Sequence, residues 1–300
     1  MSASPGAACD RSAVHVRLLR LFASDAYRPP VLPRVALQIV ELSQRPSVTF
    51  DEVVALLEQD PMLAAKVLSI AESAFYAPRS PILSLKQAAV RLGLAALRDL
   101  VVEAALRLRV FRVPGYDAVM ERLACHSSAT AHLMRLTCAA AGVEAEYAFL
   151  CGLLHDVGIA ACLLALSDDP RSAPAPAAEL DAVLRGLHEE ASGLVTRLWG
   201  LPPVIQRIAG SHHQLEFGGS PHPVNAALIV AEALACEHGA GMVPRSEAAE
   251  EGLDANPAAL FEAACSALSL APEQLEAMRA DAGVLLGALT APAPSREPPR

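Results

Sequence analysis

Apolar residues recur at helical spacing in one short segment after another, and no stretch shows the sustained two-residue alternation of a half-buried strand. Ala and Leu dominate a composition that is 53% hydrophobic and only 4% aromatic. Such residues lose little conformational freedom in a helix, whereas strands draw on β-branched and aromatic residues. The sequence therefore predicts an all-α protein.

Capping signals mark where individual helices begin. Thr49 precedes Glu52 by three residues, and Ser84 precedes Gln87 at the same spacing, as in a capping box. Asp60 stands before a proline, which suits the cap and the first helical position. A chain punctuated in this way is expected to form many short helices.

The second half of the chain continues the pattern. It predicts helices over residues 117–141, 144–155, 158–167, 177–187, 189–199, 202–213, 223–238, 257–268 and 272–289. Loops are expected at 168–176 and 214–222. Residues 1–14 and 290–300 are rich in Pro, Ser and Ala, and we expect them to be flexible ends.

Charge is distributed unevenly between the two halves. Residues 1–112 hold 14 Lys/Arg and 10 Asp/Glu, a net charge of +4, whereas residues 113–300 carry a net charge of −13. The overall charge of −9 argues against a protein whose whole surface binds nucleic acid. The asymmetry indicates two parts with different surfaces.

Cysteine usage and the lack of a long apolar run indicate a cytoplasmic protein without a membrane span. The seven cysteines include no C-x-x-C pair, which is typical of reduced thiols. The longest apolar run, 157–166, is about half of the roughly 20 residues needed to cross a bilayer. The first residues, MSASPGAACDR, do not resemble a secretory signal.

Histidines and carboxylates form the pattern with most chemical content. In GLLHDVG (152–158) a His-Asp pair stands at a probable helix end, and Ser-His-His follows at 211–213. Adjacent residues of a helix point about 100° apart, so both reach one ion only where the helix opens, and Gly158 is expected to supply that opening. An Fe, Mn or Zn ion takes such ligands from several helices. The candidate set is His126, His155, Asp156, His188, His212 and Glu232.

Simpler interpretations stay open for individual residues. His155 and Asp156 are also compatible with a hydrogen-bonded pair at a helix end. Glu232 lies in an apolar helix, where a buried carboxylate needs a partner or a raised pKa. His132 lies on a different helix face from His126 and is expected to be a surface or core histidine, and Trp199 a packed helix end.

Five long runs resemble the HDOD domains, which are relatives of the HD phosphohydrolases of bacterial signalling proteins. The runs are LLEQDPMLAAKVLSIAESAFY (56–76), SPILSLKQAAVRLGLAALRDLVV (80–102), ACHSSATAHL (124–133), YAFLCGLLHDVG (147–158) and TRLWGLPPVIQRIAGSHH (196–213). They follow the family's order and belong to a resemblance over roughly residues 28–240. It implies an N-terminal helical bundle (15–112) packed on an HD-like bundle (113–240), with helices of 241–289 packing on the latter.

A comparison with the HD-GYP phosphodiesterases extends the ligand set. Their metal ligands follow the order His, His-Asp, His, His-His and acid, which here implies His126, His155-Asp156, His188, His212-His213 and Glu232. We expect at most one residue of the His-His pair to contact an ion.

This chain also departs from these family patterns at four places. Ile159 replaces a lysine that contacts the substrate phosphate, and QLEFGGSPHP replaces the Gly-Tyr-Pro loop. Glu232 stands where Asp is usual, and in the amino-terminal motif of the HDOD resemblance Glu72 stands where Asn is usual. The departures imply that a metal site, even a vestigial one, is retained while phosphodiester hydrolysis loses a contact and a loop.

The sequence thus indicates a signal-transduction module that binds a protein partner or a small ligand such as a nucleotide, rather than an enzyme. The alternative is a metal-dependent phosphohydrolase acting on a nucleotide or cyclic dinucleotide. Arg98, Arg107 and Arg109 form either a solvated helical face or a docking face for an acidic partner. DNA binding through two short helices within 84–112 is a third, weaker interpretation.

Overall fold

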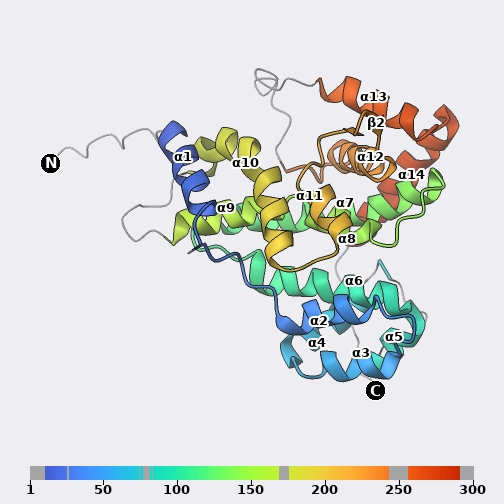
Figure 1. Ribbon diagram of the computed structural model, residues 1–300. Helices are drawn as coiled ribbons and strands as arrows, with labels where there is room; N and C mark the ends of the chain where they lie inside the picture. Colours follow the sequence, from blue (N-terminus) through green and yellow to red (C-terminus); the bar gives the residue numbers. More distant parts are fainter. Residues whose placement is uncertain are drawn as a thin grey trace.

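The structure of the protein is a computed structural model that describes residues 11–25, 27–73, 75–76, 82, 84–168, 176–242 and 256–290 (Figure 1). Helices dominate these residues, so the predicted all-α class is confirmed. The N-terminal bundle contains α2 (Arg34–Leu42), α3 (Phe50–Leu57), α4 (Pro61–Ala71), α5 (Leu85–Leu92) and α6 (Leu94–Ala105), which continues as the π-helical turn η1 (Leu106–Val110).

The second bundle carries the histidine motifs. It contains α7 (Asp117–Ala140), α8 (Ala148–Leu154), α9 (Val157–Ser167), α10 (Ala177–Leu198), α11 (Pro203–Ala209) and α12 (Pro223–Glu237). A two-residue antiparallel hairpin, β1 (Glu216–Phe217) with β2 (Ser220–Pro221), joins α11 to α12. Helices α13 (Pro257–Ala267) and α14 (Pro272–Thr290) pack against α12 and α7.

The capping residues act as the sequence predicts. The Thr49 hydroxyl accepts from the Glu52 N–H, and the Glu52 carboxylate accepts from the Thr49 N–H, which completes a capping box. Asp60 caps α4, and Ser84 accepts from the N–H of Gln87 at the start of α5. These bonds satisfy backbone donors that a helix start otherwise leaves without partners.

The N-terminal segment differs from the expectation. Residues 1–10 lie outside the described residues, but residues 11–14 belong to helix α1 (Arg11–Phe22). Helix α1 packs on α9 and α10 of the second bundle, where Leu18 is buried (Figure 1). Because its apolar face covers these helices, the segment from residue 15 is not part of the N-terminal bundle.

Trp199 is a packed helix end, and its Nε1 donates to the Pro30 carbonyl at 2.9 Å.

Two further boundaries differ. The predicted helices 177–187 and 189–199 form the single helix α10, since nothing between them breaks the backbone pattern. Thr290, placed in the flexible tail by the sequence, ends α14, and residues 291–300 lie outside the described residues.

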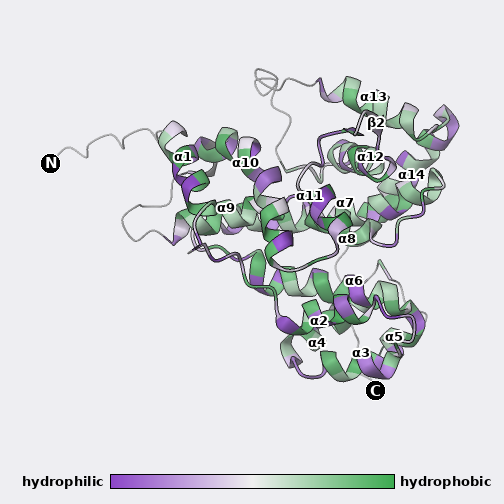
Figure 2. Cartoon of the chain, in the orientation of Figure 1, coloured by the Kyte–Doolittle hydropathy of each residue, from purple (hydrophilic) through white to green (hydrophobic). Residues whose placement is uncertain are grey.

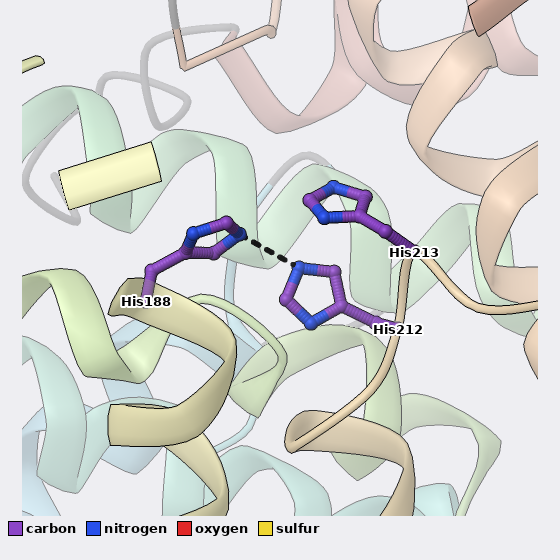
Figure 3. Close-up of side chains that lie close together, drawn as sticks. All are labelled: His188, His212 and His213. Atoms are coloured by element: carbon purple, nitrogen blue, oxygen red, sulfur yellow. Dashed lines mark hydrogen bonds between the residues drawn. The ribbon is translucent and has the colours of Figure 1, made fainter. Parts of the chain in front are cut away.

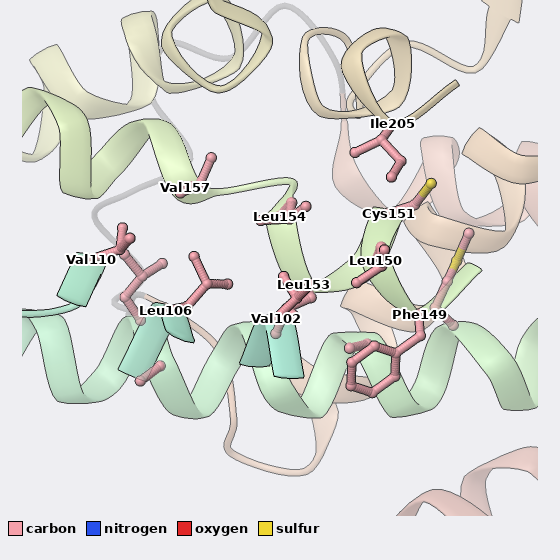
Figure 4. Close-up of a cluster of buried hydrophobic side chains, with 14 of the residues drawn as sticks. Val102, Leu106, Val110, Phe149, Leu150, Cys151, Leu153, Leu154, Val157 and Ile205 are labelled. Atoms are coloured by element: carbon pink, nitrogen blue, oxygen red, sulfur yellow. The ribbon is translucent and has the colours of Figure 1, made fainter. Parts of the chain in front are cut away.

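One continuous apolar core connects the two bundles. Helix α6 packs on α2 and α4 on one side and on α8 on the other. Val102, Leu106 and Val110 point toward α8 and the start of α9 (Figure 4). Helix α9 is almost wholly apolar (green in Figure 2). The stretch Ala148–Ser167 is apolar and long enough to cross a membrane, but 83% of it is buried inside the protein.

The basic segment of α6 and η1 does not form a shared exposed face. Arg98 is 1% exposed, because its guanidinium pairs with Asp99 at 2.9 Å and donates to the Glu146 carbonyl at 3.0 Å. Arg107 is half-buried and Arg109 is exposed. The prediction that Arg98 is a docking residue is therefore wrong, whereas docking through Arg107 and Arg109 stays a prediction.

The DNA-binding interpretation also fails on burial. Helices α5 and α6 do form two short helices around a turn at Gly93, whose φ is +82°. A recognition helix must present its side chains to a groove. In α6, however, every residue from 97 to 105 is buried.

His132 is a core histidine. It is 3% exposed, and its ring lies 4.1 Å from that of Phe75 and 5.0 Å from that of Phe149, centroid to centroid. Burial, with smaller contributions from Arg135 and Arg107, lowers its pKa to about 3. The native protein therefore holds this imidazole neutral.

The neutral state of the buried His132 predicts that the stability of the folded protein depends on pH. A substitution of His132 is expected to remove this contribution. In the unfolded chain His132 takes up a proton below about pH 6.5, whereas the folded protein binds it only near pH 3, so its contribution to stability falls as the pH falls between these values. A His132→Met variant lacks this contribution. We expect the difference in free energy of unfolding between the variant and the wild type to shift in favour of the variant by about 1.4 kcal/mol for each pH unit below pH 6. Urea unfolding at pH 7, 6 and 5 measures the difference, and a difference independent of pH would contradict it.

Candidate metal centre

The predicted ligands come from five helices and the turns that follow them. His126 lies in the middle of α7, His188 on α10 and Glu232 on α12. His155 and Asp156 lie between α8 and α9, and His212 and His213 follow α11. The second bundle thus supplies the whole set.

The His-Asp pair occupies a break between two helices. Residues 155 and 156 interrupt the helical pattern between α8 and α9, which lets two adjacent side chains turn toward one point, as the sequence predicts. Gly158 does not supply this opening, because it already lies in the first turn of α9.

Asp156 stands at the centre of four imidazoles. Its Oδ2 lies 3.5 Å from Nε2 of His126 and 3.4 Å from Nε2 of His155. Its Oδ1 lies 3.6 Å from Nε2 of His188 and 3.4 Å from Nε2 of His212. Each carboxylate oxygen therefore faces a pair of imidazole nitrogens.

The Nδ1 atom of each of these four rings lies within hydrogen-bond distance of a backbone carbonyl oxygen. The contacts are His126 Nδ1 to Ala240 at 2.8 Å, His155 to Gly152 at 2.7 Å, His188 to Arg185 at 2.9 Å and His212 to Ala209 at 3.2 Å. A carbonyl only accepts, so each Nδ1 donates. A neutral imidazole has one N–H, and its Nε2 then carries a lone pair.

These lone pairs point at one another. The Nε2 atoms of His126 and His155 are 3.1 Å apart, and those of His188 and His212 are 3.2 Å apart (Figure 3). Two acceptors at such a distance repel unless a proton or a metal cation lies between them. The geometry therefore requires positive charge at this point of the core.

Protonation of the cluster follows the same geometry. Burial lowers the pKa of His126 and lowers that of His212 to about 4. Burial also opposes the charged form of His155, but Asp156 outweighs it and raises the pKa of this imidazole. Burial opposes ionisation of Asp156 too, and His155 nevertheless lowers its pKa. Without a metal, one proton on His155 thus serves both Asp156 and His126.

His213 lies at the exposed rim of the cluster between two carboxylates. Its Nε2 is 3.8 Å from Glu232 Oε1, and its Nδ1 is 3.8 Å from Glu189 Oε2. Despite burial, these carboxylates raise the pKa of His213 to about 11. Glu232 has the partner that a carboxylate in an apolar helix needs, and His213 lowers its pKa against the effect of burial.

The structure therefore brings all seven predicted residues to one place. The ligand atoms of His126, His155 and Glu232 lie within 4.8 Å of one another, and so do those of His188, His212 and His213. Both residues of the His-His pair thus lie at the cluster, and that at most one of them contacts an ion stays a prediction.

Sequence reasoning missed Glu189. It accepts from the backbone N–H of His213 at 2.8 Å and so fixes the turn after α11. A spacing signal was present, because Glu189 and His213 are 24 residues apart, as are His188 and His212. A conventional ligand search overlooks such a residue because it binds the backbone.

Comparison with known proteins identifies a family for the chain. The HDOD domain family matches residues 30–215. An uncharacterised protein of Treponema pallidum (strain Nichols) is 28% identical over 197 residues, which is 62% of this chain, and the chain spans 38% of that protein's length.

Solved structures share the fold. A protein of Shewanella amazonensis SB2B, provisionally described as a metal-dependent phosphohydrolase, is 20% identical with a TM-score of 0.68 over 93% of this chain and 98% of its own. An HDOD domain protein of unknown function from Geobacter sulfurreducens is 21% identical with a TM-score of 0.60, over 92% and 98% of the two chains. A protein of Marinobacter aquaeolei VT8, provisionally described as a signal transduction protein, is 21% identical with a TM-score of 0.53, over 93% and 67%. With the family match covering more than half of its length and its two bundles superimposing on an HDOD structure, the chain belongs to the HDOD domain family.

Proposed function

We propose that this HDOD protein is a signal-transduction module whose HD-like bundle binds two divalent transition-metal ions. Its output is binding to a protein partner, rather than hydrolysis of a phosphodiester. The observation that carries the metal site is the carboxylate of Asp156 between two facing pairs of Nε2 lone pairs.

The residues fit two ions bridged by one carboxylate. Metal bonds of about 2.1 Å at angles of 90–110° place neighbouring ligand atoms about 3.0–3.4 Å apart. The distances among Asp156 and its four imidazoles run from 3.1 to 3.6 Å. One ion would be held by Asp156 Oδ2 with His126, His155 and Glu232, the other by Oδ1 with His188, His212 and His213.

The ligand chemistry favours Fe, Mn or Zn, because imidazole with carboxylate suits these ions better than Ca²⁺ or Mg²⁺. The carbonyls at the Nδ1 atoms act as outer partners that fix ring orientation. A bound ion of this kind lowers the pKa of a coordinated water toward neutrality.

A regulatory role is supported by what surrounds the ligands. Ile159, where HD-GYP enzymes have a lysine, is an apolar side chain that is 8% exposed and offers no charge to a phosphate. Among the seven ligands only His213 and Glu232 have side chains more than 20% exposed. The similarity of the fold to a protein described as a signal transduction protein points in the same direction. We expect the module to act in the cytoplasm, where its described cysteines, all free, remain reduced.

Hydrolysis of a nucleotide or cyclic dinucleotide is the second candidate. The specific observation in its favour is that the ligand atoms of His155, Asp156 and His212, all buried, lie within 4.8 Å of one another. The fold also resembles that of a protein described as a metal-dependent phosphohydrolase. A site that only fixes structure would not need an exposed rim at His213.

Close backbone contacts hold the ligand-bearing helices together. A Cβ on Gly158 would lie 2.2 Å from the His188 carbonyl and 2.5 Å from the Ser192 backbone nitrogen. The Gly158 N–H also donates to the Ser192 hydroxyl at 2.8 Å. Only glycine lets α9, which follows Asp156, approach α10, which carries His188, so closely.

We predict that the protein contains close to two transition-metal ions per chain and that Asp156→Asn loses most of them. An amide cannot bridge two cations as a carboxylate does. Elemental analysis of protein purified without chelators measures the content. Asp181→Asn is the matched control, because Asp181 lies on α10 but pairs with Arg185 outside the cluster. Metal-free wild type, or equal content in the two variants, would refute the site.

Metal removal is expected to destabilise the wild type and the Asp181→Asn control, but not Asp156→Asn. An ion at 100 times its Kd contributes about 2.7 kcal/mol to the folded state. Thermal unfolding with chelator and after Mn²⁺ return should therefore shift for the wild type and Asp181→Asn, but not for Asp156→Asn. A thermal unfolding midpoint that Mn²⁺ leaves unchanged in all three proteins would contradict the proposal.

Turnover separates the two candidate functions. We expect the Mn²⁺-loaded or Fe²⁺-loaded protein to hydrolyse bis(p-nitrophenyl) phosphate and cyclic dinucleotides no faster than Asp156→Asn does. Hydrolysis that the wild type shows and Asp156→Asn lacks would overturn the non-catalytic proposal and establish the second candidate.

Gly158→Ala is expected to destabilise the protein by about 3 kcal/mol, because the new methyl group meets backbone atoms that cannot move aside. The control is Gly186→Ala on the exposed side of α10, where the Cβ meets nothing closer than 3.9 Å. That change should stabilise the helix by about 0.5–1 kcal/mol. Chemical denaturation measures both, and equal effects would argue against the close contact.

A further inference from the structure

We propose that Arg98 is a positioning residue for the metal centre, fixing the start of α8, and thereby His155 and Asp156 at its other end, to the N-terminal bundle. The inference rests on the proposed metal site for its functional meaning. Arg98 itself touches none of the seven ligands; it acts through the segment that leads into them.

Arg98 makes its contacts to residues just before α8. Its Nη2 donates to the Glu146 carbonyl at 3.0 Å, and its Nη1 lies 3.4 Å from Glu146 Oε1. Its guanidinium carbon lies 4.7 Å from the centroid of the Tyr147 ring. One side chain of α6 thus binds the backbone, the carboxylate and the ring of the two residues that precede α8.

A buried ion-pair network fixes Arg98 in turn. Its Nε donates to Asp99 Oδ1 at 2.9 Å, and the other oxygen of Asp99 pairs with Arg135 of α7. Arg135 lies over the ring of Phe149 in α8, 4.6 Å from its centroid. A buried arginine loses its partners at high cost, and its planar fork restricts where they lie. The start of α8 is therefore held from both α6 and α7.

Helix α8 is short enough to transmit this position. It has seven residues, which corresponds to about 10 Å of helix, and His155 follows it directly. Leu153 near its far end lies beside Val102 of α6, within the apolar core that the two helices share (Figure 4). Helix α8 is thus tied to α6 by a polar contact at its start and an apolar contact at its end, while its larger interface is with α7.

A rearrangement of the Arg98 contacts would consequently loosen the segment that leads to His155 and Asp156, while the packing of α8 on α7, which carries His126, remains. A partner that shifts the N-terminal bundle would then change metal affinity. By reciprocity, metal binding would change the bundle's affinity for that partner. The Arg98 contact supplies a physical link between the two parts of the module.

Hydrogen exchange and metal binding of an Arg98→Met variant of the full chain test the inference. We expect faster exchange of the amides in 148–158 without metal, about tenfold weaker Mn²⁺ binding, and an altered Co²⁺ absorption spectrum. Arg107→Met is the matched control: it too removes an arginine from a buried carboxylate, Glu103, but Arg107 has no contact with residues 146–147. It should leave all three readouts at wild-type values.

Each outcome has a separate meaning. Folded Arg98→Met with wild-type exchange in 148–158 overturns the positioning role, and so does an equal change in Arg107→Met. Wild-type protein that binds no Mn²⁺ overturns the proposed function instead, while the exchange comparison still decides the role of Arg98. If Arg98→Met does not fold, Tyr147→Leu removes the ring beneath the guanidinium and should raise exchange in the same segment; unchanged exchange there overturns the inference.

Discussion

The carboxylate of Asp156 is the group on which the arrangement of the second bundle depends. It is 5% exposed, and a buried charge is tolerated only with compensating positive charge or hydrogen bonds. Here the neighbours are four imidazoles whose Nδ1 atoms are already committed to carbonyls, so the compensating charge is either a proton on Nε2 of His155 or a cation bound by the Nε2 lone pairs. The same four rings that make the site unfavourable when empty of cations make it a good ligand set. In the proposed metal-bound state, cations take the place of the proton between these groups.

The sequence predicted which histidines and carboxylates gather around Asp156, because the type of these residues and their order along the chain indicate metal-ligand chemistry. Helix starts were equally predictable, since a cap such as Thr49 and its partner Glu52 lie three residues apart and interact locally. Spacing along the chain also placed His155 and Asp156 at a helix break. Local rules of this kind need no knowledge of the tertiary fold.

What the sequence could not predict depends on which helices meet. Arg98 has the same local pattern as a solvated arginine, and only the approach of residues 146–147 buries it. Helix α1 has an apolar face that fits either bundle, and its packing on α9 and α10 decides the matter. Gly158 was interpreted as the opening between two helices, whereas its role is to let α9 approach the backbone of α10. Periodicity identifies a buried face but not the surface that buries it.

The buried charges of the first 112 residues leave the charge asymmetry in place, because Arg98 is buried together with the carboxylates of Asp99 and Glu103. Arg98 also donates to the segment before α8. The seam between the bundles is therefore polar where α6 meets the start of α8 and apolar where it meets the end. The two ends of this seam differ in what they restrict. Polar contacts at the start of α8 fix its register relative to α6, whereas apolar contacts at its end tolerate sliding. In the proposed coupling, a change in the N-terminal bundle reaches residues 146–147 through the few hydrogen bonds of Arg98.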